Sequence, residues 1–260
     1  MRAPPQEETP ADSPDNPTDS TSTLDPLDWS DLRAQAHRML DDILDYQQDI
    51  RQRPVWQPVP QAVRASFQQG LPQQSAELSA THDVFMTDIL PYAIGNAHPG
   101  FMGWVHGAGT PVGMLAEMLA AGLNANLGGR EQIPVEVERQ VTRWMRDLFG
   151  FPEYASGLFV TGTSMANLIA LLVARAAALG VEVRRQGLFA SGVQLTAYAS
   201  AGAHKCIYKA MEVAGIGSEF LRIIPMNDRF QMDVAALERA IAEDRAAGFK
   251  PFFIAGTAGS

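Results

Sequence analysis

Three short stretches combine glycine with hydroxyl or imidazole side chains, and each could contact a ligand. In the first, TGTSMANLIALLVAR, Gly162, Thr163 and Ser164 stand where a strand-like run changes into an apolar helix. The N-terminus of a helix presents unpaired backbone N–H groups and a partial positive charge, which favour an anion such as a phosphate. The pattern is also typical of a core helix with a Ser or Thr cap, so this stretch alone allows both interpretations.

Histidine and threonine stand in the other two stretches. His204, in ASAGAHKCIYKA, begins a predicted helix just after a predicted strand, and it could either face a ligand or cap that helix. Lys205 follows directly, and helical neighbours point about 100° apart, so we expect Lys205 to point away from a ligand that His204 contacts. Thr257 lies in the glycine turn AGTAGS, which suits either a ligand contact or a plain turn.

Composition argues against several other classes of protein and site. His98 and His106 lie on a glycine-rich loop without a carboxylate or cysteine partner, so we expect no metal site. Most of the net charge of -9 comes from the first 31 residues, and the nearly neutral remainder argues against a nucleic-acid surface. We find no membrane-spanning run and no signal peptide, and the single cysteine, Cys206, favours a reducing cytoplasm.

Helical patterns dominate the first part of the chain. Residues 1–27 are rich in proline, serine, threonine and acids, which predicts a disordered acidic tail. Helical spacing then predicts a small helical segment over residues 28–95, with a proline-rich connector inside it. The glycine-rich residues 95–111 predict a functional loop. Further helices are expected over residues 111–124, 134–149 and 164–180.

Strands and helices alternate from residue 195 onwards. Strands are expected over residues 195–200 and 220–226, and residues 251–260 read as a strand that runs into a glycine turn. Helices are expected over residues 204–215 and 233–248 between the strands. This alternation predicts βαβ units and a parallel sheet, which is an α/β fold. The three strands read as apolar on both faces, as a sheet covered by helices requires. Ligands of such sheets bind at the carboxyl ends of the strands.

The order of these motifs resembles the group II pyridoxal-phosphate-dependent decarboxylases, such as the aromatic-L-amino-acid, glutamate and diaminobutyrate decarboxylases. The resemblance covers roughly residues 28–260 and rests on HPGFMGWVHG, PVEVERQVTRWM, TGTSMANLIALLVAR, YASAGAHKCIYKA and the run from IIPMNDRF to AGTAGS. It implies an α/β fold of the pyridoxal-phosphate fold type I class. Residues 96–260 would belong to its large domain, and residues 28–95 would form an arm that wraps the partner in a homodimer.

The resemblance also implies which residues contact the cofactor, pyridoxal 5′-phosphate. Gly162, Thr163 and Ser164 match the positions that hold its phosphate. His204 matches a histidine that stacks on the cofactor ring, and Thr257 matches a threonine at the cofactor's edge.

Substrate contacts follow from the same resemblance. The loop over residues 95–111, with Trp104 and His106, looks like the substrate-pocket loop. Gly107 stands where the aromatic branch has a threonine, while Asn124 and Asn126 resemble the glutamate branch. Together these positions favour a polar amino acid over an aromatic one.

The resemblance implies decarboxylation of an amino acid, but two parts of the family's site are missing. The aspartate for the ring nitrogen belongs to a D-x-A strand end and the Schiff-base lysine to a D-x-H-K turn, and we find neither segment in these 260 residues. We therefore interpret the chain as the N-terminal portion of a decarboxylase and expect no turnover from it alone. The alternatives are another fold type I enzyme, such as an aminotransferase or a carbon–carbon lyase, and a non-catalytic chain that only dimerises.

Overall fold

The structure is a computed structural model that describes residues 25–103, 107, 109–128 and 131–258. It divides into two compact units, one ending at Asn126 and the other beginning at Leu127. Almost all of the predicted tail, residues 1–24, lies outside the described residues. Within those residues, no helix combines the length and the apolar character needed to cross a membrane.

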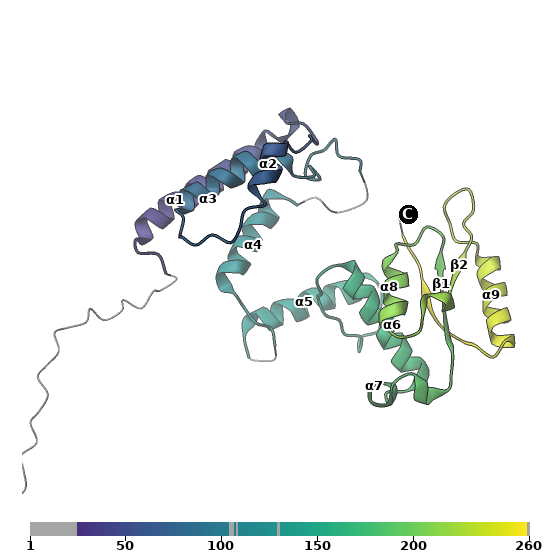
Figure 1. Ribbon diagram of the computed structural model, residues 1–260. Coiled ribbons are helices and arrows are strands. Elements are labelled where there is room, and N and C mark those ends of the chain that lie inside the picture. The colour runs from purple at the N-terminus through teal and green to yellow at the C-terminus, as the bar shows by residue number, and fades with distance from the viewer. Residues whose placement is uncertain (1–24, 104–106, 108, 129–130, 259–260) are drawn as a thin grey trace, which may run out of the picture. The chain divides into compact units, whose positions relative to one another are not determined.

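The N-terminal unit is helical (Figure 1). Asp28 begins its first helix, since the carboxylate accepts hydrogen bonds from the N–H groups of Ser30 and Asp31. The helices are α1 (Trp29–Gln48), α2 (Gln61–Ser66), α3 (Leu78–Val84) and α4 (Pro111–Leu123). A π-helical turn (Phe85–Ile89) and a 3₁₀ turn (Leu90–Tyr92) extend α3, and another 3₁₀ turn (Ile50–Gln52) follows α1. This compact unit includes α4 and so extends beyond residue 95, the predicted end of the arm.

A buried histidine joins two helices of this unit. The Nδ1 atom of His82 on α3 lies 3.2 Å from the amide nitrogen of Gln35 on α1. Its Nε2 atom lies 3.4 Å from a carboxylate oxygen of Asp42, about two turns further along α1. Both ring nitrogens therefore have partners on α1, and the pairing holds α3 against that helix.

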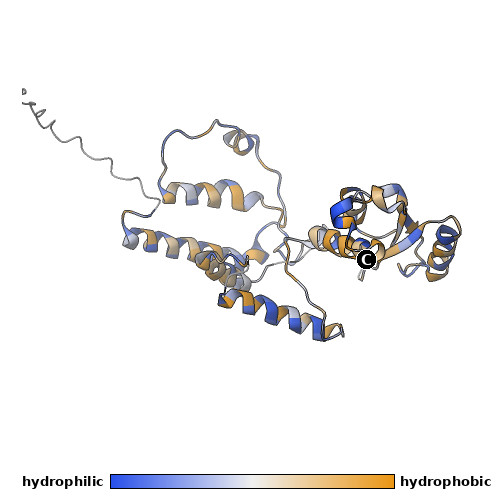
Figure 2. Cartoon of the chain, turned by 90° about the horizontal axis from the view of Figure 1, so that it is seen from below, coloured by the Kyte–Doolittle hydropathy of each residue, from blue (hydrophilic) through white to orange (hydrophobic). Residues whose placement is uncertain are grey.

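The C-terminal unit is an α/β layer structure. It consists of α5 (Ile133–Leu148), α6 (Thr163–Leu179), α7 (Val183–Gln186), β1 (Leu195–Ser200), α8 (Cys206–Val213), β2 (Leu221–Ile224), α9 (Val234–Ala246) and β3 (Lys250–Ala255). Short 3₁₀ turns lie at Phe189–Ser191 and Ser218–Phe220. Asp233 caps α9 through a hydrogen bond of 2.9 Å from the N–H of Ala236, and Gly180, with φ +88°, follows the end of α6. Figure 2 shows both hydrophilic and hydrophobic stretches in the helices of this unit.

The three strands form a parallel sheet, as the alternation of strands and helices predicted. Their order in the sheet is β2-β1-β3. Ala197 at the centre of β1 pairs with Leu221 of β2 and Phe253 of β3. Helices α6 and α8 cover one face of the sheet and α9 covers the other (Figure 1). The carboxyl ends of the strands therefore share one edge, next to the N-termini of the helices that follow them.

One face of β1 is apolar and contributes to the main core. Its residues Leu195, Ala197 and Ala199 are buried against Leu171 of α6 and Met211 of α8. Because side chains alternate along a strand, the intervening residues point to the other face, towards α9.

That second face corrects our expectation that the strands are apolar on both sides. Thr196 and Tyr198 are fully buried, and their hydroxyl oxygens lie 3.1 Å apart. The Tyr198 hydroxyl donates to Asp244 of α9 at 2.7 Å, and Arg222 of β2 donates to the same carboxylate at 2.7 Å. The aromatic ring fills the space beneath α9 while each polar group finds a partner, so a polar network is stable there.

Candidate cofactor-binding site

The N-terminus of α6 is left open by its own sequence. Gly162 occupies the N-cap position, and no side chain caps the helix. Within the described residues, the N–H groups of Thr163, Ser164 and Met165 form no hydrogen bond. Asp28, Thr110 and Asp233 cap α1, α4 and α9 with their side chains. The open end of α6 thus presents three free donors and the positive end of the helix dipole to an anion.

Glycine is required at position 162 by the backbone rather than by crowding. Its φ is +88°, a conformation that other residues rarely adopt. A Cβ atom at this position would meet no atom within 4 Å, so space remains for a ligand to approach the backbone.

His204 caps a helix, which is one of the two functions that its sequence context left open; its ligand contact remains a prediction. Its Nδ1 accepts a hydrogen bond of 3.1 Å from the N–H of Cys206, so the imidazole caps the first turn of α8. The neutral ring therefore carries its proton on Nε2, which has no partner among the described residues. The cap restrains the orientation of an exposed ring whose other nitrogen is free to contact a ligand.

A cavity of about 440 Å³ brings the open helix end and the histidine together. Ser164 of α6 and His204 before α8 both line it, although they are 40 positions apart in the sequence. Asn167 supports this arrangement, since its side-chain amide donates to the Thr163 carbonyl at 3.0 Å and to the Cys206 sulfur at 3.5 Å. The remaining lining residues are Met165, Leu168, Lys205, Cys206, Lys209, Ala210 and Val213.

Lys205 corrects a further expectation. It lines the same cavity as His204, whereas we expected the two to point apart. The spacing of about 100° holds within a regular helix, and α8 begins only at Cys206, so His204 and Lys205 precede it. Sequence reasoning also gave no role to Lys209, although its position four residues after Lys205 could have indicated a shared helix face.

Thr257 lies at the predicted edge of the sheet but not in the cavity. Ala199 of β1 pairs with Ala255 of β3, so the exposed Thr257 follows the carboxyl end of a neighbouring strand. The cavity lining does not include it, and its contact with the cofactor remains a prediction.

The four predicted substrate residues belong to the other part of the chain. Asn124 ends α4 in the left-handed conformation, with φ 45°, and Asn126 is the last residue of the N-terminal unit. Trp104 and His106 lie outside the described residues. The Gly107 carbonyl, in the same loop, accepts a hydrogen bond of 3.2 Å from Asn96. Substrate contacts of these residues therefore also remain predictions.

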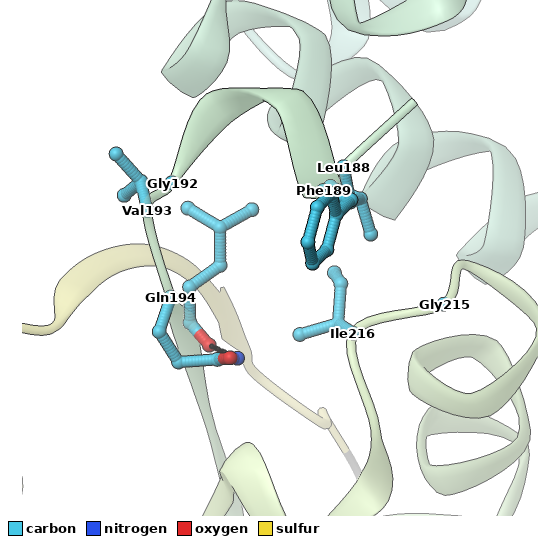
Figure 3. Close-up of a pocket in the computed structure, with 8 residues that line it drawn as sticks. Leu188, Phe189, Gly192, Val193, Gln194, Gly215 and Ile216 are labelled. Carbon is cyan, nitrogen blue, oxygen red and sulfur yellow. Dashed lines mark hydrogen bonds between the residues drawn. The ribbon is translucent and has the colours of Figure 1, made fainter. Parts of the chain in front are cut away.

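A second cavity, of about 490 Å³, lies at the opposite end of β1 (Figure 3). Phe189 and Ile216 form one side of it, and Val193 and Gln194 form the other. It adjoins Leu195, the first residue of β1, and so lies at the amino ends of the strands. Parallel sheets bind their ligands at the carboxyl ends, which favours the first cavity as the cofactor site.

Comparison with known proteins identifies the family of this fold and site. The model of the pyridoxal-dependent decarboxylase conserved domain matches residues 60–260. The chain belongs to the pyridoxal-dependent decarboxylase family. Pyridoxal phosphate is the cofactor of this family, so the predicted family and cofactor are both confirmed.

Curated relatives include decarboxylases of aromatic amino acids. The chain is 28% identical to the aromatic-L-amino-acid decarboxylase of Bacillus atrophaeus over 241 residues, which cover 90% of this chain and 48% of the relative. It is 30% identical to tryptophan decarboxylase 2 of Oryza sativa subsp. japonica over 250 residues, with coverages of 91% and 49%. The chain thus spans about half the length of these relatives.

Solved decarboxylase structures have the same fold. Oryza sativa TDC with PLP and tryptamine matches with a TM-score of 0.77 at 25% identity, covering 92% of this chain and 53% of that one. Catharanthus roseus tryptophan decarboxylase in complex with L-tryptophan matches with a TM-score of 0.75 at 26% identity, covering 89% and 50%. The predicted α/β fold of the fold type I class is therefore confirmed.

Proposed function

We propose that this chain supplies the cofactor-phosphate site of a pyridoxal-phosphate-dependent amino-acid decarboxylase. The observation that carries the proposal is the open N-terminus of α6, which has three free N–H groups. Ser164, in the first turn of this helix, lines a cavity together with His204. A phosphate ester fits this position because it accepts hydrogen bonds from backbone N–H groups and carries the charge that a helix N-terminus attracts.

The residues of the cavity suit the rest of the cofactor as well. We assign phosphate binding to Gly162, Thr163 and Ser164, and ring stacking to His204, whose exposed ring is restrained by its bond to the Cys206 N–H. Met165 and Leu168 add apolar side chains to the lining of the cavity. Bound pyridoxal phosphate supplies an electron-withdrawing ring that stabilises the charge left when carbon dioxide departs from the substrate.

The wider assignments complete the proposal. The substrate is an amino acid, contacted by Trp104, His106, Asn124 and Asn126, and Thr257 lies at the edge of the cofactor. The enzyme is a cytoplasmic homodimer in which residues 28–95 form the dimerisation arm. Because the ring-nitrogen aspartate and the Schiff-base lysine are not recognised among these residues, we expect the 260-residue chain to bind cofactor without turnover.

The proposal is tested by placing a negative charge at the open end of α6. A carboxylate near a helix N-terminus stabilises the helix by about 0.3–1 kcal/mol. It also repels a phosphate, so Ser164→Asp should maintain or raise the melting temperature while weakening pyridoxal phosphate binding by at least about tenfold. Calorimetric titration and thermal unfolding of the same samples measure the two effects.

Ser164→Asn is the matched control, because it adds a polar side chain of similar size without a charge. It should bind the cofactor within about threefold of the unmodified chain, as expected for an exposed neutral hydrogen-bonding change. Equal binding by the Asp and Asn variants would contradict a phosphate site at α6.

A further inference from the structure

We propose that Lys205 and Lys209 are the counter-charges of the cofactor phosphate and make this site select phosphorylated over unphosphorylated ligands. The inference rests on the proposed function, because it assumes that the phosphate binds at the N-terminus of α6. It adds two binding residues to the helix end and the hydroxyl groups already described.

The two lysines share one face at the start of α8. Lys205 is the N-cap residue of the helix, and its carbonyl accepts a hydrogen bond of 3.3 Å from the Lys209 N–H, so the two residues lie one helical turn apart on α8. Both line the cavity that Ser164 lines from α6. Lysine side chains are long and flexible, which lets two exposed ammonium groups adjust to one anion.

No acid neutralises the lysines in this cavity. Within the described part of the chain, neither ammonium group forms an ion pair or a hydrogen bond. The described residues that line the cavity include no aspartate or glutamate. The nearby Glu212, also on α8, pairs with neither lysine. The positive charge of the two lysines is therefore available to a ligand.

The charge of a phosphate ester matches this arrangement. Such a group carries roughly −1.5 to −2 at neutral pH, and a helix N-terminus contributes only about +0.5. The open end of α6 thus leaves more than about one negative charge without compensation, and two lysines can supply it. No arginine lines the cavity to provide the charge instead.

A binding experiment with the 260-residue chain isolates the charge effect. We choose pyridoxine 5′-phosphate and pyridoxine as probes because neither has an aldehyde, so replacing a lysine cannot remove a covalent partner. The double variant Lys205→Gln, Lys209→Gln should raise the Kd of pyridoxine 5′-phosphate on the order of tenfold, since exposed charge pairs each contribute a few-fold. The Kd of pyridoxine should stay within about twofold, because that probe carries no phosphate charge.

Arg184→Gln is the matched control. Arg184 is an exposed cation of α7, before the amino end of β1, and its replacement removes one charge away from the cavity. It should leave both affinities unchanged. Thermal unfolding of all variants shows whether the fold is retained.

The possible results separate the two proposals. If the unmodified chain binds pyridoxine 5′-phosphate and Ser164→Asp weakens it, but the double lysine variant binds normally, the lysine assignment is wrong and the proposed function stands. Equal weakening of both probes by the double variant would also overturn the assignment, because it would show a loss independent of phosphate. If the unmodified chain does not bind the phosphorylated probe, both proposals are wrong.

Discussion

His204 caps α8 with one ring nitrogen and leaves the other without a partner among the described residues. Its sequence context suggested a cap or a ligand contact as alternatives. The structure shows that the first does not prevent the second, because only Nδ1 is needed for the cap. A restrained ring is a better stacking surface than a mobile one, since less freedom is lost when a ligand binds.

Burial and hydrogen bonding shift the pKa values of Tyr198 and Asp244 in the polar network beneath α9. Burial raises the pKa of Tyr198 to about 12, and its hydrogen bond to Asp244 adds to this shift. Burial also tends to raise the pKa of Asp244, but hydrogen bonds from Arg222, Tyr198 and Thr196 outweigh it and hold that pKa below its usual value. At neutral pH the network therefore contains a neutral phenol and an ionised carboxylate.

The Tyr198 shift predicts a loss of stability in alkali. The folded chain holds the phenolic proton more tightly than the unfolded chain, so this contribution is complete below pH ~10 and is lost as the pH rises towards 12. Its size is roughly 2–3 kcal/mol for a shift of about two pKa units. Tyr198→Phe should remove this step from the pH dependence of the free energy of unfolding between pH 9 and 12. Urea denaturation at a series of pH values measures that free energy.

Tyr208, which is only partly buried, provides the control in Tyr208→Phe. That variant should keep the alkaline step of the unmodified chain. An unchanged step in Tyr198→Phe would show that other groups cause the loss.

At the scale of elements, periodicity and caps predicted most helices and strands of the described residues. Asp233 and Gly248 stand at the two ends of α9 as expected for a cap and a stop. The start of α8 was less predictable, because His204 and Lys205 look helical by composition and the structure begins the helix at Cys206. Helix ends depend on individual hydrogen bonds, here the one accepted by His204, which composition does not encode.

The packing of α6 predicts unequal effects from two substitutions on one helix. Leu171 is fully buried between the sheet and α8, so Leu171→Ala leaves a cavity and should lower the free energy of unfolding by about 2–5 kcal/mol. Val173 is 63% exposed, and Val173→Ala should change the free energy of unfolding by less than about 0.5 kcal/mol. Chemical denaturation of both variants checks the difference, and similar losses in the two would argue against the described orientation of α6.

At the scale of the whole molecule, the N-terminal unit exposes several large apolar side chains. Along α4, the side chains of Val112, Met118, Leu119 and Leu123 are each more than half exposed. Glu117 is the only charged residue of this helix. Surface of this kind is typical of a protein interface, and it supports the proposed homodimer.

The dimer proposal predicts that charges on α4 disrupt association. Leu119→Lys combined with Leu123→Lys should shift the 260-residue chain from dimer to monomer at micromolar concentration, because buried unpaired charges oppose contact. Val234→Lys, at an exposed residue at the start of α9 in the C-terminal unit, is the control and should leave the dimer intact. Sedimentation equilibrium measures the outcome, and a monomeric unmodified chain would refute the homodimer.

The sequence by itself determined the family, the cofactor class and the parallel α/β character of the C-terminal unit. The family and the cofactor class follow from the resemblance of the motif order to known decarboxylases. The parallel α/β character follows from local patterns: glycines at turns, caps at helix ends, and apolar runs of strand or helix length. The same resemblance predicts Gly162, Ser164 and His204 as residues of the cofactor site.

Only the tertiary structure decided which of these residues lie close together and how the strands are ordered. The strand order β2-β1-β3, the polar face of β1 and the cavity between α6 and α8 all depend on contacts between residues distant in the sequence. Lys205 and Lys209 became candidates for the same reason, since their significance depends on Ser164 lining the same cavity. Local patterns report the period of an element, whereas a binding site depends on how elements pack against each other.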